Sequence, residues 1–222
     1  MIIWRDGVTR STCWWTCHDA HADMRGVTRI VLVNLASLAQ PVLADTFVRP
    51  DIITDPTPAR FSVCSEHTCK RVTVVGLQPE QWQRERRLFL PPPLDAVQER
   101  ERIAQAIALM EAMVGPLTGT EQDKGRNFQG VGIEGQMDCI DESTNTTTYL
   151  TMLLKDGLLK WHSVEDRATR GFFIFGWPHT TAVIREAGSD ALFAVDSWFL
   201  DNGQPPYIQK LEDWRDKKDF DE

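Results

Sequence analysis

The stretch D-C-I-D-E-S-T-N-T-T-T-Y-L-T-M-L-L-K, residues 138–155, decides the fold class of this chain. Five of the six residues at 149–154 are apolar and Gly157 follows, so we predict a helix that begins at Asp138 and ends at Lys155. Cys139 then lies in the first turn. A helix N-terminus offers unpaired N–H groups and a partial positive charge, and both stabilise a thiolate. The stretch therefore predicts a candidate nucleophile at a helix N-terminus.

The segments on either side of this helix differ in their periodicity. Upstream, residues 94–114 repeat apolar side chains at helical spacing, and Gly115-Pro116 predicts the end of that helix. Further upstream we expect a helix at 78–89 and two short strands at 61–64 and 69–77. Downstream, strand patterns occupy 159–164, 172–175, 180–184 and 192–195. Helices followed by antiparallel strands indicate an α+β fold.

Two polar residues stand at the ends of predicted neighbouring strands. His179 begins the run H-T-T-A-V-I, and Asp196 ends the run A-L-F-A-V-D. Side chains alternate between the faces of a sheet, so the two share a face only if they are directly opposed or two residues apart. A hairpin loop with an even number of residues permits this pairing.

Three runs together resemble a known family. They are G-Q-M-D-C-I-D-E-S-T-N (135–145), W-P-H-T-T-A-V-I (177–184) and F-A-V-D-S-W (193–198). Their order and local context are similar to the transglutaminase-like branch of the papain-like cysteine enzymes. The resemblance covers residues 94–215 and leaves 45–93 as an N-terminal extension. It implies a papain/transglutaminase-like core that uses no cofactor and no metal.

The same resemblance assigns roles to residues. Cys139 is the expected nucleophile, His179 the base and Asp196 the group that orients the base, in acyl transfer or hydrolysis of a peptide-like amide through a thioester. Gln136 is a weaker candidate oxyanion donor. Trp177 and Trp198 are candidate walls of the substrate cleft.

Each of these assignments has an alternative. Cys139 could be a buried core cysteine, and the negative charges of Asp138 and Asp141 oppose thiolate formation. The alternative function is a non-catalytic envelope binding or structural module that retains the fold. His162 is a rival base, although no carboxylate faces it as plainly in the sequence.

The N-terminal residues have a secretory pattern. Residues 24–44 carry two arginines, a short apolar stretch and small residues before Asp45, so we expect a signal peptide and an exported, periplasmic protein. Residues 1–23 would then lie upstream of the true start.

Cysteine usage agrees with this export. After cleavage Cys64 and Cys69 can form a disulfide, and Cys139 remains as a single thiol. Two free thiols, or a metal pair completed by His67, are the alternatives. His67 is otherwise expected to be exposed to solvent.

The overall charge limits the partners. The chain carries a formal net charge of −8 without a basic stripe, which excludes a nucleic-acid footprint. The apolar part of 24–44 is too short to span a bilayer, so no stable membrane span is expected after cleavage. A peptide or cell-envelope component is the expected substrate. Residues 216–222 form a charged tail, and no pattern specifies an oligomeric state.

Overall fold

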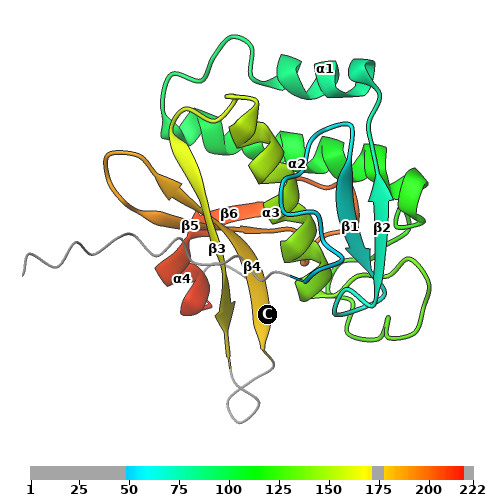
Figure 1. The fold of residues 1–222 in the computed structure, drawn as a ribbon. Helices are drawn as coiled ribbons and strands as arrows, with labels where there is room; N and C mark the ends of the chain where they lie inside the picture. The colour runs from blue at the N-terminus through cyan, green and yellow to red at the C-terminus, as the bar shows by residue number, and fades with distance from the viewer. Residues whose placement is uncertain (1–48, 172–177, 218–222) are drawn as a thin grey trace, which may run out of the picture. The chain divides into compact units, whose positions relative to one another are not determined.

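A computed structural model describes residues 49–171 and 178–217 (Figure 1). The predicted segments 1–23 and 24–44, the strand at 172–175 and Trp177 lie outside the described residues. In chain order, the elements are β1 (Phe61–Ser65), β2 (Arg71–Val75), α1 (Pro79–Leu88), α2 (Ala96–Thr118), α3 (Cys139–Lys155), β3 (His162–Arg170), β4 (His179–Glu186), β5 (Leu192–Asp196), β6 (Tyr207–Lys210) and α4 (Leu211–Arg215).

The strands form two antiparallel sheets. β3, β4, β5 and β6 pair in sequence order in a four-stranded sheet, and β1 pairs with β2 in a separate hairpin. Helices α1, α2 and α3 precede the larger sheet in the chain, so the α+β class is confirmed. β6 was not predicted from the sequence, and β3 extends to Arg170 through an irregularity between Glu165 and Ala168.

Helix α3 lies between the hairpin and the sheet, and contacts both β1 and β4 (Figure 1). Tyr149, Leu150 and Leu153 of α3 are almost fully buried in one cluster with Phe61 of β1 and Ile184 of β4. Burying each such side chain stabilises the fold by roughly 1.5–3 kcal/mol, which is why the apolar half of α3 holds the helix in the centre of the unit.

The segment predicted as an N-terminal extension is part of this core. The side-chain oxygen of Asn145 in α3 accepts the main-chain N–H of Cys64 at 2.7 Å, and its amide nitrogen donates to the carbonyl of Cys64 at 2.9 Å. Over the described residues, the hairpin and α3 therefore fold around one hydrophobic core rather than as separate layers of chain.

Helix α2 is longer than predicted. It continues through Pro116 to Thr118, and Gly119, with φ at 81°, provides the left-handed residue that ends it. Pro116 removes only one helical N–H, while the Thr118 hydroxyl donates to the Val114 carbonyl at 3.1 Å. Because Gly115 and Thr118 of this last turn are buried, their tertiary packing outweighs the sequence signal for termination.

Among the residues that the structure describes, no helix combines the length and apolarity needed to cross a bilayer.

Candidate active site

Cys139 is the first residue of α3, and Asp138 caps the helix. The Asp138 carboxylate accepts the N–H groups of Ile140 at 3.0 Å and Asp141 at 2.9 Å, while the Asp141 carboxylate accepts the N–H of Asp138 at 3.2 Å. This reciprocal capping box fixes the start of the helix at Cys139. It also occupies the N–H groups of residues 140 and 141.

His179 and Asp196 meet across the β4–β5 hairpin. Ala182 pairs with Val195 around a four-residue loop, so Asp196 lies two residues away from His179 on the same face of the sheet. The loop is even, as the pairing requires, but the two residues are diagonal rather than directly opposed. The imidazole Nε2 of His179 lies 2.7 Å from Oδ2 of Asp196.

This contact determines the tautomer of His179. An ionised carboxylate can only accept, so Nε2 carries the proton and Nδ1 keeps its lone pair. The same Asp196 oxygen accepts the indole N–H of Trp214 at 2.7 Å. Asp196 is therefore held by two donors and orients the imidazole.

The Cys139 thiol lies against the main chain on both sides of His179. Its sulfur is 4.0 Å from the carbonyl oxygen of Pro178, and the N–H of Thr180 lies close enough to lower the pKa of the thiol. Burial raises the pKa of the thiol to about 11, the Thr180 N–H opposes this shift, and the charges of Asp138 and Asp196 add to it. The resting thiol is therefore protonated at neutral pH.

Aromatic rings surround the imidazole of His179. Ring centroids of Trp198, Phe199 and Trp214 lie 4.9, 5.2 and 5.6 Å from its own. These rings keep water from the His179–Asp196 pair and leave the cleft as the open side of the histidine.

A cleft of about 650 Å³ opens beside Cys139 and His179. Trp198 lines it, as expected for a cleft wall. Gln136 does not belong to its lining, because the Gln136 amide nitrogen donates to the carbonyl of Gln122 at 3.1 Å and its oxygen accepts from Asn127. Further lining residues are Lys70, Arg126, Phe128, Val131, Arg170 and Phe199.

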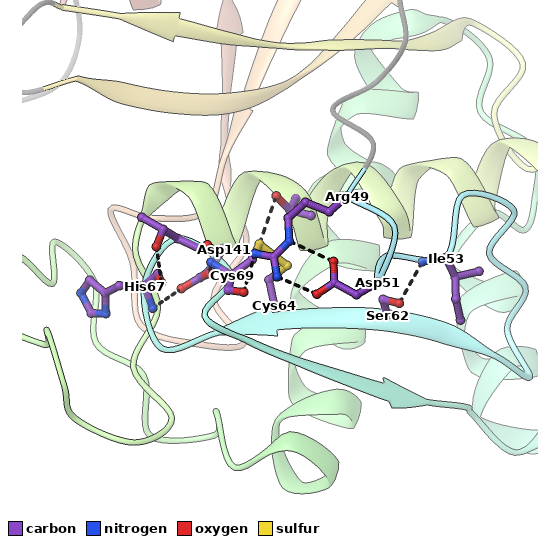
Figure 2. Close-up of polar contacts among 10 residues, drawn as sticks. Arg49, Asp51, Ile53, Ser62, Cys64, His67, Cys69 and Asp141 are labelled. Carbon is purple, nitrogen blue, oxygen red and sulfur yellow. Dashed lines mark hydrogen bonds and ion pairs between the residues drawn. A yellow bond between two sulfur atoms is a disulfide. The ribbon is translucent and has the colours of Figure 1, made fainter.

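The disulfide loop braces the start of α3 (Figure 2). The sulfurs of Cys64 and Cys69 are bonded, at 2.18 Å. The Asp141 carboxylate accepts the N–H of His67 at 2.8 Å and that of Cys69 at 2.6 Å, and Asp138 accepts the N–H of Thr68 at 2.9 Å. All four residues at 66–69 have positive φ, which turns successive N–H groups toward these carboxylates.

Arg49 closes the outer side of this loop. Its guanidinium donates to the carbonyls of Thr68 at 3.2 Å and Cys69 at 2.6 Å, and pairs with Asp51 at 2.6 Å (Figure 2). Arg49 therefore stabilises the same disulfide loop that contacts the N-terminus of α3.

The metal alternative finds little support in this loop. The sulfurs of Cys64 and Cys69 and a carboxylate oxygen of Asp141 lie within 4.8 Å of one another. Both sulfurs are joined in the disulfide, so neither is the thiolate that a metal would need. The expectation that His67 is exposed is wrong, since both of its ring nitrogens are buried and neither has a hydrogen-bond partner among the described residues.

Three buried carboxyl groups lie behind the start of α3. Asp123 accepts the N–H of Met137 at 2.7 Å, and Glu111 accepts that of Gly203 at 2.8 Å. Burial raises the pKa of Glu111 to about 8 and of Asp123 to about 6, and holds that of Glu142 well above its usual range. Repulsion between the carboxylates adds to the shifts of Glu111 and Glu142, so the group contains protonated carboxyls at neutral pH.

The rival base His162 lies at the opposite end of the sheet. It pairs with Glu186, whereas His179 pairs with Arg170 eight residues further along β3. The structure corrects the expectation that no carboxylate faces His162 as plainly, because its Nδ1 lies 3.0 Å from Glu99. Glu99 is distant in sequence, and no local pattern connects the two residues.

Sequence reasoning missed Trp214 as a neighbour of the site and missed Arg126, Arg170 and Phe199 as lining of the cleft. Trp214 lies in the short terminal helix α4. The sequence shows a tryptophan near the C-terminus, but it does not show that the indole N–H bonds to Asp196.

Comparison of the chain with protein-family models, curated proteins and solved structures found no match.

Proposed function

We propose that this protein is a thiol-dependent enzyme with a papain/transglutaminase-like core that transfers or hydrolyses the acyl group of a peptide-like amide. The observation that carries the proposal is the arrangement of three groups. His179 is oriented by Asp196 at 2.7 Å, and the Cys139 sulfur sits beside the main chain that flanks this histidine, at the edge of a cleft.

The proposed reaction begins with a neutral thiol. Since the thiol pKa is raised to about 11, His179 acts as a general base during attack rather than as the partner of a preformed thiolate. The Cys139 sulfur forms a bond to the amide carbonyl carbon while its proton moves to Nδ1 of His179. Asp196 stabilises the resulting imidazolium through its bond to Nε2.

The second half of the reaction returns the proton. The tetrahedral intermediate collapses, the carbon–nitrogen bond breaks, and the imidazolium protonates the leaving amine. Water or another amine then attacks the thioester, so the products are a carboxylic acid or a new amide. With the N–H groups of residues 140 and 141 occupied by Asp138, the N–H of Cys139 itself is the candidate oxyanion donor in the first turn.

A defined peptide mixture tests the proposal. We expect new carboxyl termini in water and hydroxamates when hydroxylamine is added as the amine acceptor, both detected by mass spectrometry. Cys139→Ala should give neither product. Wild-type products identical to those of Cys139→Ala would contradict the proposal and favour the alternative of a non-catalytic envelope module.

We also propose that the protein is exported to the periplasm, with a peptide or cell-envelope component as substrate. The Cys64–Cys69 disulfide supports this, because structural disulfides persist in oxidising compartments. Mass spectrometry of the protein from its native host is expected to find a mature N-terminus near Asp45. A mature chain that retains residues 24–44 would contradict export by signal cleavage.

A further inference from the structure

The walls of the cleft carry a different charge balance from the rest of the chain. The protein has a formal net charge of −8, yet the cleft lining includes Lys70, Arg126, Arg170 and Lys217 against the carboxylates of Glu66 and Asp138. A cation-lined cleft in an acidic protein concentrates anions at the cleft.

The two acids in the lining are already engaged. The Asp138 carboxylate accepts three main-chain N–H groups, from residues 68, 140 and 141. Glu66 lies 3.9 Å from Lys70 and 3.3 Å from Arg71. Neither carboxylate therefore forms an ion pair with Arg126 among the described residues.

Arg126 is the cation best placed to meet a ligand. It is exposed, its backbone has a φ of 57°, and the N–H of Arg126 donates to the carbonyl of Trp198 at 2.8 Å. That bond ties its loop to the segment directly after Asp196. Its guanidinium stands 5.5 Å from the centre of the Phe199 ring, and no carboxylate among the described residues pairs with it.

Phe199 connects Arg126 with the candidate catalytic histidine. Its ring centre lies 5.2 Å from that of His179, and the Arg170 guanidinium lies 6.0 Å from the same ring. Phe128 and Val131 are exposed on the same loop as Arg126 and line the cleft. Arg126 and the apolar side chains of Phe128 and Val131 therefore line the same cleft as His179, and the Phe199 ring is near both Arg126 and the imidazole.

We propose that the cleft selects acyl donors that carry a carboxylate close to the reacting carbonyl and an apolar side chain beside it, with Arg126 as the residue that recognises the carboxylate. This inference rests on the proposed function and names its substrate class. An arginine recognises a carboxylate through two parallel hydrogen bonds, and Phe199 supports its planar group from one side. A side chain and a chain terminus can both supply this carboxylate, and the recognition chemistry is the same.

Two alkylating reagents test the charge preference without a known substrate. Iodoacetate and iodoacetamide react with the same Cys139 thiol and differ in one negative charge. We expect the ratio of their rate constants to be roughly tenfold higher at Cys139 than at N-acetylcysteine amide, by local concentration of the anion. Activation by His179 raises both rates together and cancels in the ratio, so this result is separate from the proposed function.

A matched pair of variants assigns the effect to one residue. Arg126→Gln should return the ratio to within about twofold of the reference thiol, whereas Arg87→Gln, an exposed arginine of α1, should leave it high. The ratio should also fall as salt rises from low to high concentration. A ratio equal to that of the reference thiol, or one unchanged by Arg126→Gln, would overturn the inference.

Binding to Cys139→Ala covers the case in which the thiol is inert. Calorimetry would compare N-acetylphenylalanine with its amide, and N-acetyl-Phe-Glu amide with N-acetyl-Phe-Gln amide. Tighter binding of the first of either pair, lost in Arg126→Gln, supports the inference and identifies a terminal or a side-chain carboxylate. Equal affinities within both pairs, or no binding by any of the four, contradict it.

Discussion

Among the described residues, two buried histidine–carboxylate pairs lie near opposite ends of the sheet, and His179 of one pair lines the cleft. His179 contacts Asp196 at 2.7 Å, and His162 contacts Glu99 at 3.0 Å. The difference is in the second ring nitrogen. Nε2 of His162 lies 3.1 Å from the Arg100 guanidinium, which also pairs with Glu186.

The chemistry of Arg100 fixes the state of His162. A guanidinium can only donate, so Nε2 accepts and Nδ1 donates to Glu99. Both nitrogens are thus occupied, and the side chain of His162 is fully buried. A histidine bound to a carboxylate is therefore not by itself a catalytic signature, since the second nitrogen must also be free to take a proton from a nucleophile.

The largest expected effect is at His179–Asp196, called the open pair because the second nitrogen of its histidine has no side-chain partner among the described residues. His179→Ala should lower the acyl-transfer rate per folded molecule by roughly 10⁴-fold, because it removes the general base. It should also lower the stability, because it leaves the buried Asp196 without its histidine partner. Activity would be measured on a peptide cleaved by the wild-type protein, with thermal unfolding followed in parallel. A variant that keeps wild-type activity would show that the open pair has no catalytic role.

At His162–Glu99, called the closed pair because both nitrogens of its histidine are bonded, we expect a loss of stability and little change in activity. His162→Ala leaves Glu99 and Arg100 without their shared partner, and we expect a loss of about 3 kcal/mol in the free energy of unfolding. Activity per folded molecule should remain within about twofold of wild type, because His162 lies at the other end of β3 from His179. Ser163→Ala, at an exposed neighbouring position, serves as the control for stability measured by urea unfolding.

The buried carboxyl cluster of Glu111, Asp123 and Glu142 extends the comparison, because one of its oxygens has no hydrogen-bond partner among the described residues. Oε1 of Glu111 has no hydrogen-bond partner among the described residues, and the pKa of Glu111 is raised to about 8. A raised carboxyl pKa means that the folded state binds more protons, so its contribution is complete below about pH 4.5 and is lost as pH rises toward 8. Wild-type stability should therefore fall between pH 5 and pH 8.

Glu111→Gln mimics the protonated side chain and should reduce that fall by roughly 1–3 kcal/mol. Urea unfolding at several pH values measures it. Glu101→Gln, at an exposed position of α2, should leave the pH dependence as it is in the wild type. An identical slope in Glu111→Gln and wild type would rule out a titrating Glu111.

The smallest expected effect concerns the positioning of Asp196. Trp214→Phe keeps an aromatic ring beside His179 but removes the indole N–H that Asp196 accepts. We expect a roughly tenfold lower kcat with a nearly unchanged KM, the cost of one lost charge-assisted hydrogen bond. The pH profile of kcat should move as well, whereas a purely structural role of Trp214 would lower stability without moving the profile.

The comparison also shows which features local sequence could predict. The helix over 138–155 follows from periodicity within a short stretch. The even hairpin loop that puts His179 and Asp196 on one face is permitted by the sequence but not required by it. The partner of His162 is 63 residues away in the chain. Long-range partners such as Glu99 and Trp214 leave no local pattern, because the fold alone brings them together.

The end of α2 illustrates the other kind of error. Gly115-Pro116 is a strong local signal for termination, yet the helix continues to Thr118, with Gly115 and Thr118 buried. Gln136 shows the same limit, since its position three residues before Cys139 says nothing about the Gln122 carbonyl that its amide contacts.

The most direct test of the central claim is the rate of Cys139 alkylation by iodoacetamide as a function of pH, in wild type, His179→Ala and His162→Ala. The account predicts rapid alkylation at pH 7 in wild type and His162→Ala, driven by proton transfer to His179. In His179→Ala the rate should rise only as pH approaches about 11, where the thiol ionises. Equal profiles in wild type and His179→Ala would contradict the proposed Cys139–His179 pair.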